Sequence, residues 1–371
     1  MIIGVPKEIK NHEYRVGLTP ASVREMCAHG HAVMVQTNAG IGIGASDEDY
    51  RNAGAEVTDT AEEIFAQSEM IIKVKELQAI ERSMLREDQI LYTYLHLAPD
   101  PEQTKDLVKS GAICVAYETV TSARGGLPLL APMSKVAGRL AVQAGAHCLE
   151  QPNGGLGKLL GGVPGVEPAK VVIIGAGVVG THAAHIAVGM GADVWVLDRN
   201  PDTLENHWQQ FGDTTNTVYS NKDTLDEHVI SADLVIGGVL IPGAEAPKLV
   251  TAEMVKQMQA GSVLVDVAID QGGCFATSHA TTHAEPTFVV DDVVHYCVAN
   301  MPGAVPRTST YALNNVTLPY ALALADKGYK QALLDDEHLR NGLNVMQGHV
   351  TYKEVADDLG YTYKPALELL S

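Results

Sequence analysis

The stretch VVIIGAGVVG, residues 171–180, decides the fold of this chain. It sets Gly175, Gly177 and Gly180 in the spacing G-x-G-x-x-G, directly after a run of β-branched residues typical of a buried strand. The alanine-rich segment 181–192 then predicts a helix, and residues 193–198 predict a second strand. In such a turn the first glycine permits the tight bend, the second lets the backbone approach a phosphate, and the third lets helix and strand pack closely. The stretch therefore predicts a Rossmann-type nucleotide-binding fold.

Asp198 ends the second strand, about twenty residues past the third glycine. A carboxylate at this place accepts hydrogen bonds from both ribose hydroxyls of NAD and repels the 2′-phosphate of NADP. Arg199, beside it, is the one feature that would suit NADP. A glycine-rich turn without any ligand is the alternative, but the strand, helix, second strand and acid all favour an NAD site.

Two domains are expected, because 371 residues exceed what one hydrophobic core usually serves. Strands alternate with helices over residues 1–129 and again over 130–306, which predicts an α/β fold with two mostly parallel sheets flanked by helices. The tail 307–371 has too little apolar sequence for a third core. We therefore expect a discontinuous domain of residues 1–129 plus 307–371, with the Rossmann domain, 130–306, inserted into it.

Composition limits the possible partners and compartment. The net charge of −19 argues against nucleic acid or an anionic membrane as a partner. No apolar run reaches the ~18 residues of a membrane span, and the opening MIIGVPKEIK lacks the form of a signal peptide. The five cysteines are scattered and odd in number, which favours a reducing cytoplasm over a disulfide framework or a zinc site.

Ligands of such sheets lie beyond the carboxyl ends of the strands. Three segments follow predicted strands of the second domain: GGVLIPG (237–243), VAIDQGG (267–273) and VANMPG (298–303). Asp270, in the second of them, could orient or deprotonate a water or an amine, or could be a turn residue before two glycines. Apolar contacts and backbone groups for the nicotinamide ribose are expected from Val239, Leu240, Ala268 and Ile269.

The first domain offers three further candidates at strand ends. Arg15 precedes a predicted helix and could bind a carboxylate, although an exposed loop arginine is the simpler interpretation. Lys73 and Lys75 share one face of the predicted strand 70–75, where a lysine could polarise a carbonyl oxygen or simply charge an edge strand. His96 ends the apolar strand 89–98 and is either an acid/base group or a core histidine.

Other polar residues carry weaker signals. The pairs His182/His185 and His279/His283 lack the Cys or carboxylate partners of a metal site, so no metal is expected. Ser134, near the start of the long predicted helix 131–151, could donate to a phosphate or cap that helix.

Several segments together resemble the alanine dehydrogenase/transhydrogenase-alpha family, and within it the alanine dehydrogenases. They are MIIGVPKEIKNHEYRVGLTP (1–20), VIIGAGVVG (172–180), VDVAIDQGGCF (265–275) and CVANMPGAVPRTSTYALNN (297–315). The resemblance covers essentially the whole chain. It implies NAD-dependent, reversible oxidative deamination of L-alanine to pyruvate and ammonium, by a homo-oligomer that is usually a hexamer.

The resemblance also implies residue roles. Arg15 would bind the substrate carboxylate and Lys75 its carbonyl oxygen, His96 would be the acid/base, and Asp270 would orient water or ammonia. Because Lys75 and His96 belong to one predicted domain and Asp270 to the other, domain closure is expected to assemble the site. The implied NAD contacts are Ser134, Gly175, Gly177, Val178, Val179, Gly180, Asp198, Ser220, Val239, Leu240, Val267, Ala268, Ile269, Asp270, Val298, Ala299, Asn300 and Met301. Two positions depart from the family pattern, where relatives often have basic residues: Thr203 and His279.

Three other functions remain open at this stage. The NAD-binding subunit of a proton-translocating transhydrogenase would have a similar opening and glycine loop, but would not need Lys75, His96 and Asp270 together. A saccharopine-type dehydrogenase would act on a larger amino acid, and a non-catalytic NAD-binding module would turn over no keto acid. Glyoxylate or serine as side substrates, and the direction of the reaction in the cell, also stay open.

Overall fold

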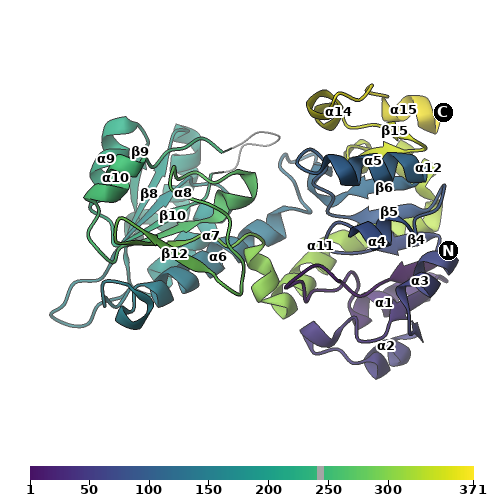
Figure 1. Cartoon of the computed structure of the whole chain (residues 1–371), viewed down its shortest axis with the longest axis horizontal. Coiled ribbons are helices and arrows are strands. Elements are labelled where there is room, and N and C mark those ends of the chain that lie inside the picture. The colour runs from purple at the N-terminus through teal and green to yellow at the C-terminus, as the bar shows by residue number, and fades with distance from the viewer. Residues whose placement is uncertain (240–245) are drawn as a thin grey trace. The chain divides into compact units, whose positions relative to one another are not determined.

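The structure is a computed structural model that describes residues 1–239 and 246–371 (Figure 1). The chain divides into two compact units, Met1–Met133 with Gly303–Ser371, and Ser134–Pro302. The first unit is therefore built from two separated stretches of chain, and the second from one continuous stretch. Leu240, an expected cofactor contact, lies outside the described residues.

The first unit is organised on an eight-stranded sheet with the order β15-β14-β6-β5-β4-β1-β2-β3. The six strands from the first half of the chain run parallel; from the tail, β14 pairs antiparallel with β6, and β15 pairs antiparallel with β14. Consequently β1, β4, β5 and β6 are neighbours, and the loops after them share one edge of the sheet. The strands are β1 (Ile2–Val5), β2 (Ala32–Gln36), β3 (Glu56–Thr58), β4 (Met70–Ile72), β5 (Ile90–Thr93), β6 (Ile113–Ala116), β14 (Leu343–Met346) and β15 (His349–Val350).

Helices begin where the sequence supplies caps. Thr19 accepts a hydrogen bond from the Ser22 amide at 3.2 Å, and Pro20 occupies the first turn of α1. The helices of this unit are α1 (Pro20–Ala28), α2 (Asp47–Ala53), α3 (Ala61–Gln67), α4 (Ala79–Arg82), α5 (Pro101–Ser110), α11 (Pro306–Lys327), α12 (Tyr329–Asp335), α13 (Glu337–Arg340), α14 (Lys353–Leu359) and α15 (Ala366–Leu370), with short 3₁₀ turns η1 (Ile41–Ile43) and η2 (Tyr117–Thr119). The long helix α6 (Ala131–Cys148) starts at the unit boundary.

The second unit has a seven-stranded sheet with the order β12-β13-β11-β10-β7-β8-β9. All pairs are parallel except β12–β13. The six parallel strands have the Rossmann order, in which the direction of strand succession across the sheet reverses between β7 and β10. Ligands of such sheets bind at that reversal. The strands are β7 (Lys170–Ile174), β8 (Asp193–Asp198), β9 (Asn216–Tyr219), β10 (Leu234–Gly237), β11 (Val263–Asp266), β12 (Thr287–Val290) and β13 (Val293–Tyr296).

Helices cover both faces of this sheet (Figure 1). Between them β7, β10, β11 and β13 bury almost every side chain, which is why these four strands read as continuous apolar runs in the sequence. The helices are α7 (Val178–Gly189), α8 (Pro201–Phe211), α9 (Lys222–Ile230) and α10 (Ala252–Gln257), with 3₁₀ turns η3 (Gln151–Asn153), η4 (Gly212–Thr214), η5 (Val267–Gln271) and η6 (Met301–Ala304).

One predicted strand is two strands in the structure. The apolar segment 287–300 predicts one strand, but residues 287–296 form a hairpin of β12 and β13, in which Asp291 and Asp292 have φ of 49° and 61°. Two left-handed residues in succession make the tight turn that joins antiparallel strands, and Asp tolerates this conformation better than most residues. The single strand predicted here is therefore wrong.

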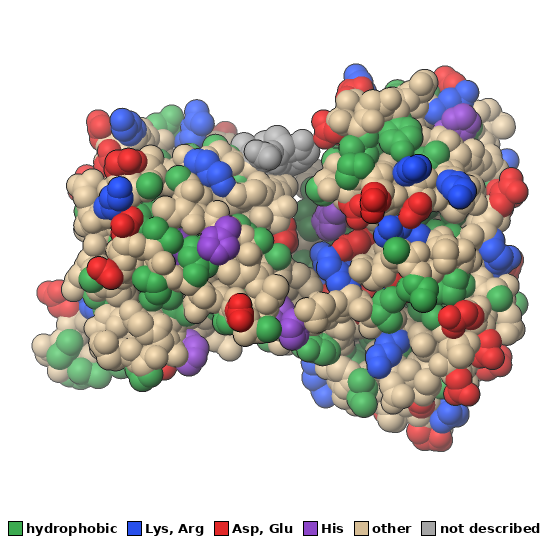
Figure 2. All heavy atoms as spheres, in the orientation of Figure 1, with side chains coloured by type: hydrophobic (Ala, Val, Ile, Leu, Met, Phe, Trp, Pro, Cys, Tyr) green, Lys and Arg blue, Asp and Glu red, His purple; other side chains and the backbone are tan. Residues whose placement is uncertain are grey.

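On the surface, Lys and Arg side chains are interspersed with Asp and Glu on the face drawn in Figure 2. All five cysteines are free thiols. Within residues 1–239 and 246–371, none of the helices combines the length and the apolar character that a membrane span requires.

Candidate active site

Arg15, Lys75 and His96 lie in the loops after β1, β4 and β5, three neighbouring strands of the first unit. Hydrogen bonds tie these loops together beyond the strand ends: Tyr94 N donates to Val74 O at 3.2 Å, and Thr93 Oγ1 donates to Lys75 O at 3.1 Å. The fold thus gathers at one sheet edge three groups that are far apart in the sequence.

Arg15 is almost fully buried and is fixed by Glu13. Its Nε and Nη2 atoms both donate to the Glu13 carboxylate, Nε at 2.7 Å, and its backbone N donates to Oε1 at 3.0 Å. Burial alone would lower the pKa of Arg15, but the hydrogen bonds and charge of Glu13 outweigh it and raise the pKa. Glu13 takes one edge of the guanidinium, and Nη1 contacts Met133 Sδ at 3.1 Å.

Lys73 and Lys75 differ in environment. Lys73 has no exposed surface and lies between Glu8 at 3.0 Å and Glu81 at 2.7 Å. Lys75 is only half-buried, and across the described residues no hydrogen bond or ion pair within 4 Å engages its ammonium group. The predicted strand 70–75 is too long, because β4 ends at Ile72, and the alternative of a charged edge strand is wrong, because β4 is a central strand. Lys73 is therefore a structural cation, and Lys75 is the one available to a ligand.

His96 lies three residues beyond the end of β5, so it is not the strand residue that the sequence predicts. Its backbone is left-handed, with φ of 49°, and its side chain is 43% exposed. The ring stacks on Tyr94, with centroids 5.8 Å apart and planes 7° apart, and Nδ1 lies 3.9 Å from Glu118 Oε1. An exposed imidazole on a fixed support suits proton transfer.

In the second unit, the glycine loop has the geometry that its spacing predicts. Gly175 has φ of 99°, and a β-carbon on Gly180 would overlap the Gly175 carbonyl oxygen. By contrast, a β-carbon on Gly177 would meet no atom within 4 Å. The open space in front of Gly177, at the N-terminus of α7, is a place where a pyrophosphate fits against backbone amides.

Asp198 braces this loop from the end of β8. Its Oδ2 accepts from Ala176 N at 2.7 Å and its Oδ1 accepts from Asn200 N at 2.8 Å. Each carboxylate oxygen keeps a further lone pair for a ribose hydroxyl. Ser220 follows β9 alongside, and its backbone N donates to Asp198 O at 2.8 Å.

Helix α6 crosses close to the start of α7. A β-carbon on Gly138 would overlap the carbonyl oxygen of Val179, so the two backbones touch there. Ser134 is one helical turn earlier on the same face of α6. Val178, in the first turn of α7, is exposed, and Val239 lies against Gly175.

Asp270 is exposed and belongs to the 3₁₀ turn η5, where the sequence predicts the end of a strand. The strand stops at Asp266, whose buried carboxylate accepts from Ala268 N, Cys274 N and Ser278 Oγ at 3.1, 3.0 and 2.7 Å. Asp266 is thus structural. The turn places four expected cofactor contacts at the carboxyl end of β11: Val267, Ala268, Ile269 and Asp270.

The last expected contacts follow β13. Val298 forms a bridge to Thr281, and Ala299 N donates to Thr281 O at 3.2 Å. Asn300 has a left-handed backbone with φ of 64°, and Met301 is buried at the start of η6. This segment therefore ends at the same edge of the sheet as the glycine loop and η5.

The two departures from the family pattern have distinct surroundings. Thr203 lies in α8, and His279 stacks on Phe288 with ring centroids 3.7 Å apart.

His182 accepts a hydrogen bond from Arg139 Nε at 3.1 Å, and burial, followed by the neighbouring Arg139 charge, lowers its pKa to about 4. In the part of the chain that the structure describes, no three His, Cys, Asp or Glu side chains gather to hold a metal ion.

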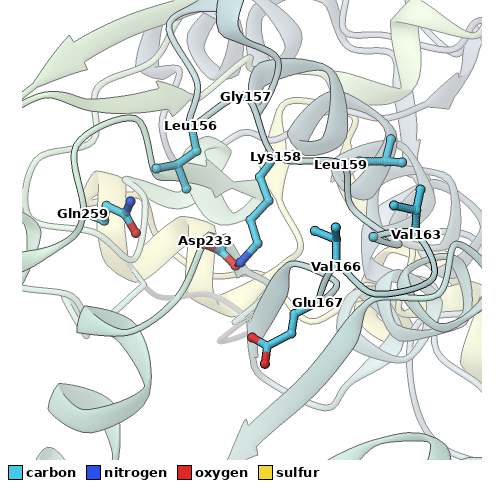
Figure 3. A pocket seen from close by; sticks show the side chains of 10 residues that line it. Leu156, Gly157, Lys158, Leu159, Val163, Val166, Glu167, Asp233 and Gln259 are labelled. Carbon is cyan, nitrogen blue, oxygen red and sulfur yellow. The ribbon is translucent and has the colours of Figure 1, made fainter.

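A separate hollow of about 500 Å³ lies in the second unit (Figure 3). Lys158 and Asp233 point toward one another across it and form an ion pair at 2.6 Å. Asp233 immediately precedes β10, so this hollow is at the amino ends of the strands, opposite the glycine loop. It is therefore distinct from the candidate site.

Known protein families and relatives match this chain over nearly its whole length. The family model described as "Alanine dehydrogenase/PNT, N-terminal domain" matches residues 4–137, and its C-terminal counterpart matches residues 141–353. An alanine dehydrogenase of Halomonas elongata is 58% identical over the full length of both chains, and one of Bacillus subtilis is 56% identical over all of this chain and 98% of its own. This chain belongs to the alanine dehydrogenase family. The resemblance inferred from the sequence is thereby confirmed.

The solved structures agree with this family. An L-alanine dehydrogenase, 51% identical, superposes with a TM-score of 0.93 over 100% of both chains. A transhydrogenase from Sinorhizobium meliloti, 25% identical, reaches 0.83 over 95% of this chain and 100% of its own. The alanine dehydrogenase assignment is thus better supported than the transhydrogenase alternative, and the predicted α/β fold of two mostly parallel sheets is confirmed.

Three residues at this site were not predicted from the sequence: Glu13, Tyr94 and Glu118. Each contacts a site residue directly; Glu13 lies within the opening segment 1–20 that carries the resemblance, whereas Tyr94 and Glu118 lie in none of the segments that carry it. For Glu118 the only signal was position, since it ends the predicted strand 112–118 much as His96 lies near the end of the predicted strand 89–98. Charged residues after parallel strands merit attention together, because the sheet brings them to one edge.

Proposed function

We propose that this protein catalyses the NAD-dependent, reversible oxidative deamination of L-alanine to pyruvate and ammonium. The observation that carries the proposal is the set of Arg15, Lys75 and His96 after three neighbouring strands, in a chain of the alanine dehydrogenase family. The set supplies a cation for a carboxylate, a second cation for a carbonyl oxygen, and a group that exchanges protons at neutral pH.

The glycine loop supports NAD as the cofactor. The space before Gly177 accepts a pyrophosphate, Ser134 and the first amides of α7 are its donors, and Asp198 receives the ribose hydroxyls. Asp198 also favours NAD over NADP, because its charge would repel a 2′-phosphate. When bound, NAD supplies the acceptor for a hydride.

The protein's own groups carry out the remaining chemistry. Arg15 holds the carboxylate of alanine, so that Cα is presented in one orientation. The Cα–H electron pair leaves as hydride and the amine lone pair forms a C=N bond. Water adds to this carbon, assisted by Asp270, and ammonia departs as the C=O bond forms.

His96 moves the protons of these steps. Nδ1 faces Glu118, so Nε2 is the atom that takes a proton from the attacking water and returns it to the leaving amine. Lys75 stabilises the negative charge that develops on the new oxygen. Reductive amination of pyruvate uses the same groups in reverse.

We also propose a homo-oligomeric state, a hexamer as the resemblance implies, and a cytoplasmic location, which the five free thiols support. The two units correspond in this proposal to a catalytic domain of 1–129 plus 307–371 and a cofactor domain of 130–306. Size-exclusion chromatography with light scattering tests the oligomer.

The activity is tested by following NADH oxidation with pyruvate, with and without ammonium. We expect turnover only when ammonium is present, and His96→Ala and Asp270→Ala should each lower it by ~100-fold or more while NADH still binds. Failure of the wild-type protein to turn over pyruvate with ammonium would reject the proposal. Turnover with larger keto acids in place of pyruvate would point to a saccharopine-type enzyme, and binding of NADH without any turnover would indicate a non-catalytic module or transhydrogenase subunit.

A further inference from the structure

His96 has a backbone conformation that residues with a β-carbon rarely adopt. With φ of 49° it is left-handed, and it lies in a loop and not in a strand ladder. A residue keeps such a conformation only where its surroundings determine it. Something outside the strand must therefore hold this loop.

Glu118 provides that hold. It lies in η2, directly after β6, the strand that neighbours β5. Its carboxylate accepts from Leu95 N at 3.1 and 3.2 Å and from His96 N at 2.6 Å. A side chain thus takes the place of the backbone carbonyls that would satisfy these amides if the strands continued.

The ring of His96 packs against a neighbouring aromatic ring. Tyr94 stacks against it in a nearly parallel arrangement, and the Tyr94 hydroxyl donates to Leu129 O at 2.6 Å. The separation of 3.9 Å between His96 Nδ1 and Glu118 Oε1 is too long for a hydrogen bond. Glu118 therefore acts on the backbone of His96 at close range and on its ring only through charge.

The same arrangement recurs at the other two site residues. Glu8 accepts from Val74 N at 2.7 Å and lies 3.4 Å from Lys75 N. Glu13 accepts from Arg15 N at 3.0 Å. At each of the three strand ends, a buried or nearly buried carboxylate binds the backbone that presents the site residue.

We propose that Glu118 is a positioning residue for the reaction: it fixes the left-handed backbone of His96 and so sets where the imidazole stands. This inference rests on the proposed function, because it assigns His96 the proton transfer. It adds a residue that neither touches the substrate in the mechanism above nor belongs to any motif in the sequence.

If Glu118 acts by holding the backbone, its side chain must offer a hydrogen-bond acceptor but need not be charged. Glutamine keeps a carbonyl oxygen at nearly the same place and can still accept from both amides, whereas alanine offers no acceptor. If the carboxylate acted chiefly through its charge, glutamine would be as poor as alanine. The pair of substitutions therefore separates the two roles.

The experiment compares Glu118→Ala, Glu118→Gln and the wild type in ammonium-dependent NADH oxidation by pyruvate. Glu118→Ala should lower kcat by ~10- to 100-fold with an unchanged Kd for NADH, and Glu118→Gln should restore kcat to within about threefold of the wild type. Glu25→Ala is the matched control: its carboxylate lies 3.6 Å from His29 in the same unit but is exposed and away from the site, and kcat should not change.

Two results would overturn the inference: a kcat for Glu118→Ala within twofold of the wild type, or a Glu118→Gln variant as slow as Glu118→Ala. Circular dichroism establishes that each variant is folded. Should Glu118→Ala not fold, Glu118→Gln is decisive, because hydrogen exchange at the amides of Leu95 and His96 must stay as slow as in the wild type. An inactive wild-type protein would reject the proposed function instead, so the two failures are distinguishable.

Discussion

Lys73 and Lys75 are two residues apart and have opposite tasks. Lys73 is buried between Glu8 and Glu81, which outweigh the effect of burial and raise its pKa, so it stays charged. Lys75 lies in the loop after β4 and is half-buried. At the scale of single residues, one cation is held by two buried carboxylates and the other is available to a ligand.

These tasks predict different consequences of removing each charge. Lys73→Met leaves two carboxylates buried without a counter-charge, so the free energy of unfolding should fall by about 3–5 kcal/mol. Lys75→Met should alter stability by less than about 0.5 kcal/mol but lower kcat by ~100-fold. Urea denaturation followed by circular dichroism, together with the pyruvate assay, measures both. Equal stability loss in the two variants would contradict the assignment.

Elements differ in how well the sequence predicted them. The glycine loop and its flanking strand and helix could be predicted because the pattern is local and each glycine has a steric reason. The ends of strands could not be predicted. Tyr94, Leu95 and Leu97 are as buried as the residues of β5 before them, although β5 has already ended at Thr93. The strand β14, LNVM, was missed because four residues carry too little periodicity. Glu118 was missed since only the neighbouring strand ends give it a partner.

The glycine loop predicts a contrast between two alanine substitutions. Gly180→Ala forces a β-carbon onto the Gly175 carbonyl, so unfolding should become easier by about 1–3 kcal/mol. Gly177→Ala meets nothing in the protein, so stability should hold while the Kd for NADH rises by ~10-fold. Trp195 and Trp208, the only tryptophans, both lie in the second unit and report its unfolding by fluorescence. Unchanged NADH affinity in Gly177→Ala would refute the proposed pyrophosphate contact.

For the whole molecule, acid should act unequally on the two units. Burial lowers the pKa of four histidines among the described residues, and all four lie in the second unit: His182, His207, His228 and His295. For His182 and His207 the pKa falls to about 4. Their neutral forms favour folding, so this stability is complete above pH 6.5, where the unfolded histidines are neutral too, and is lost as pH falls from 6.5 toward 4.

The tryptophan signal tests this expectation directly. Between pH 7 and pH 5 the urea midpoint of the second unit should decrease, with His207 contributing up to about 3 kcal/mol by pH 4. His207→Phe, which keeps an aromatic ring beside Phe211, should flatten the dependence. A midpoint that stays constant over this range in the wild type would show that these rings are not held neutral by burial.

The split construction of the first unit has a consequence for biosynthesis. Strand β6 pairs on one side with β5 and on the other with β14, which is translated more than two hundred residues later. Until then, the apolar edge Ile113–Ala116 emerges from the ribosome with one side unpaired. The second unit, by contrast, is complete once residue 302 is outside the exit tunnel. The unit that is translated first therefore completes its sheet last. We expect chaperones that bind unpaired strand edges to be needed longest at β6.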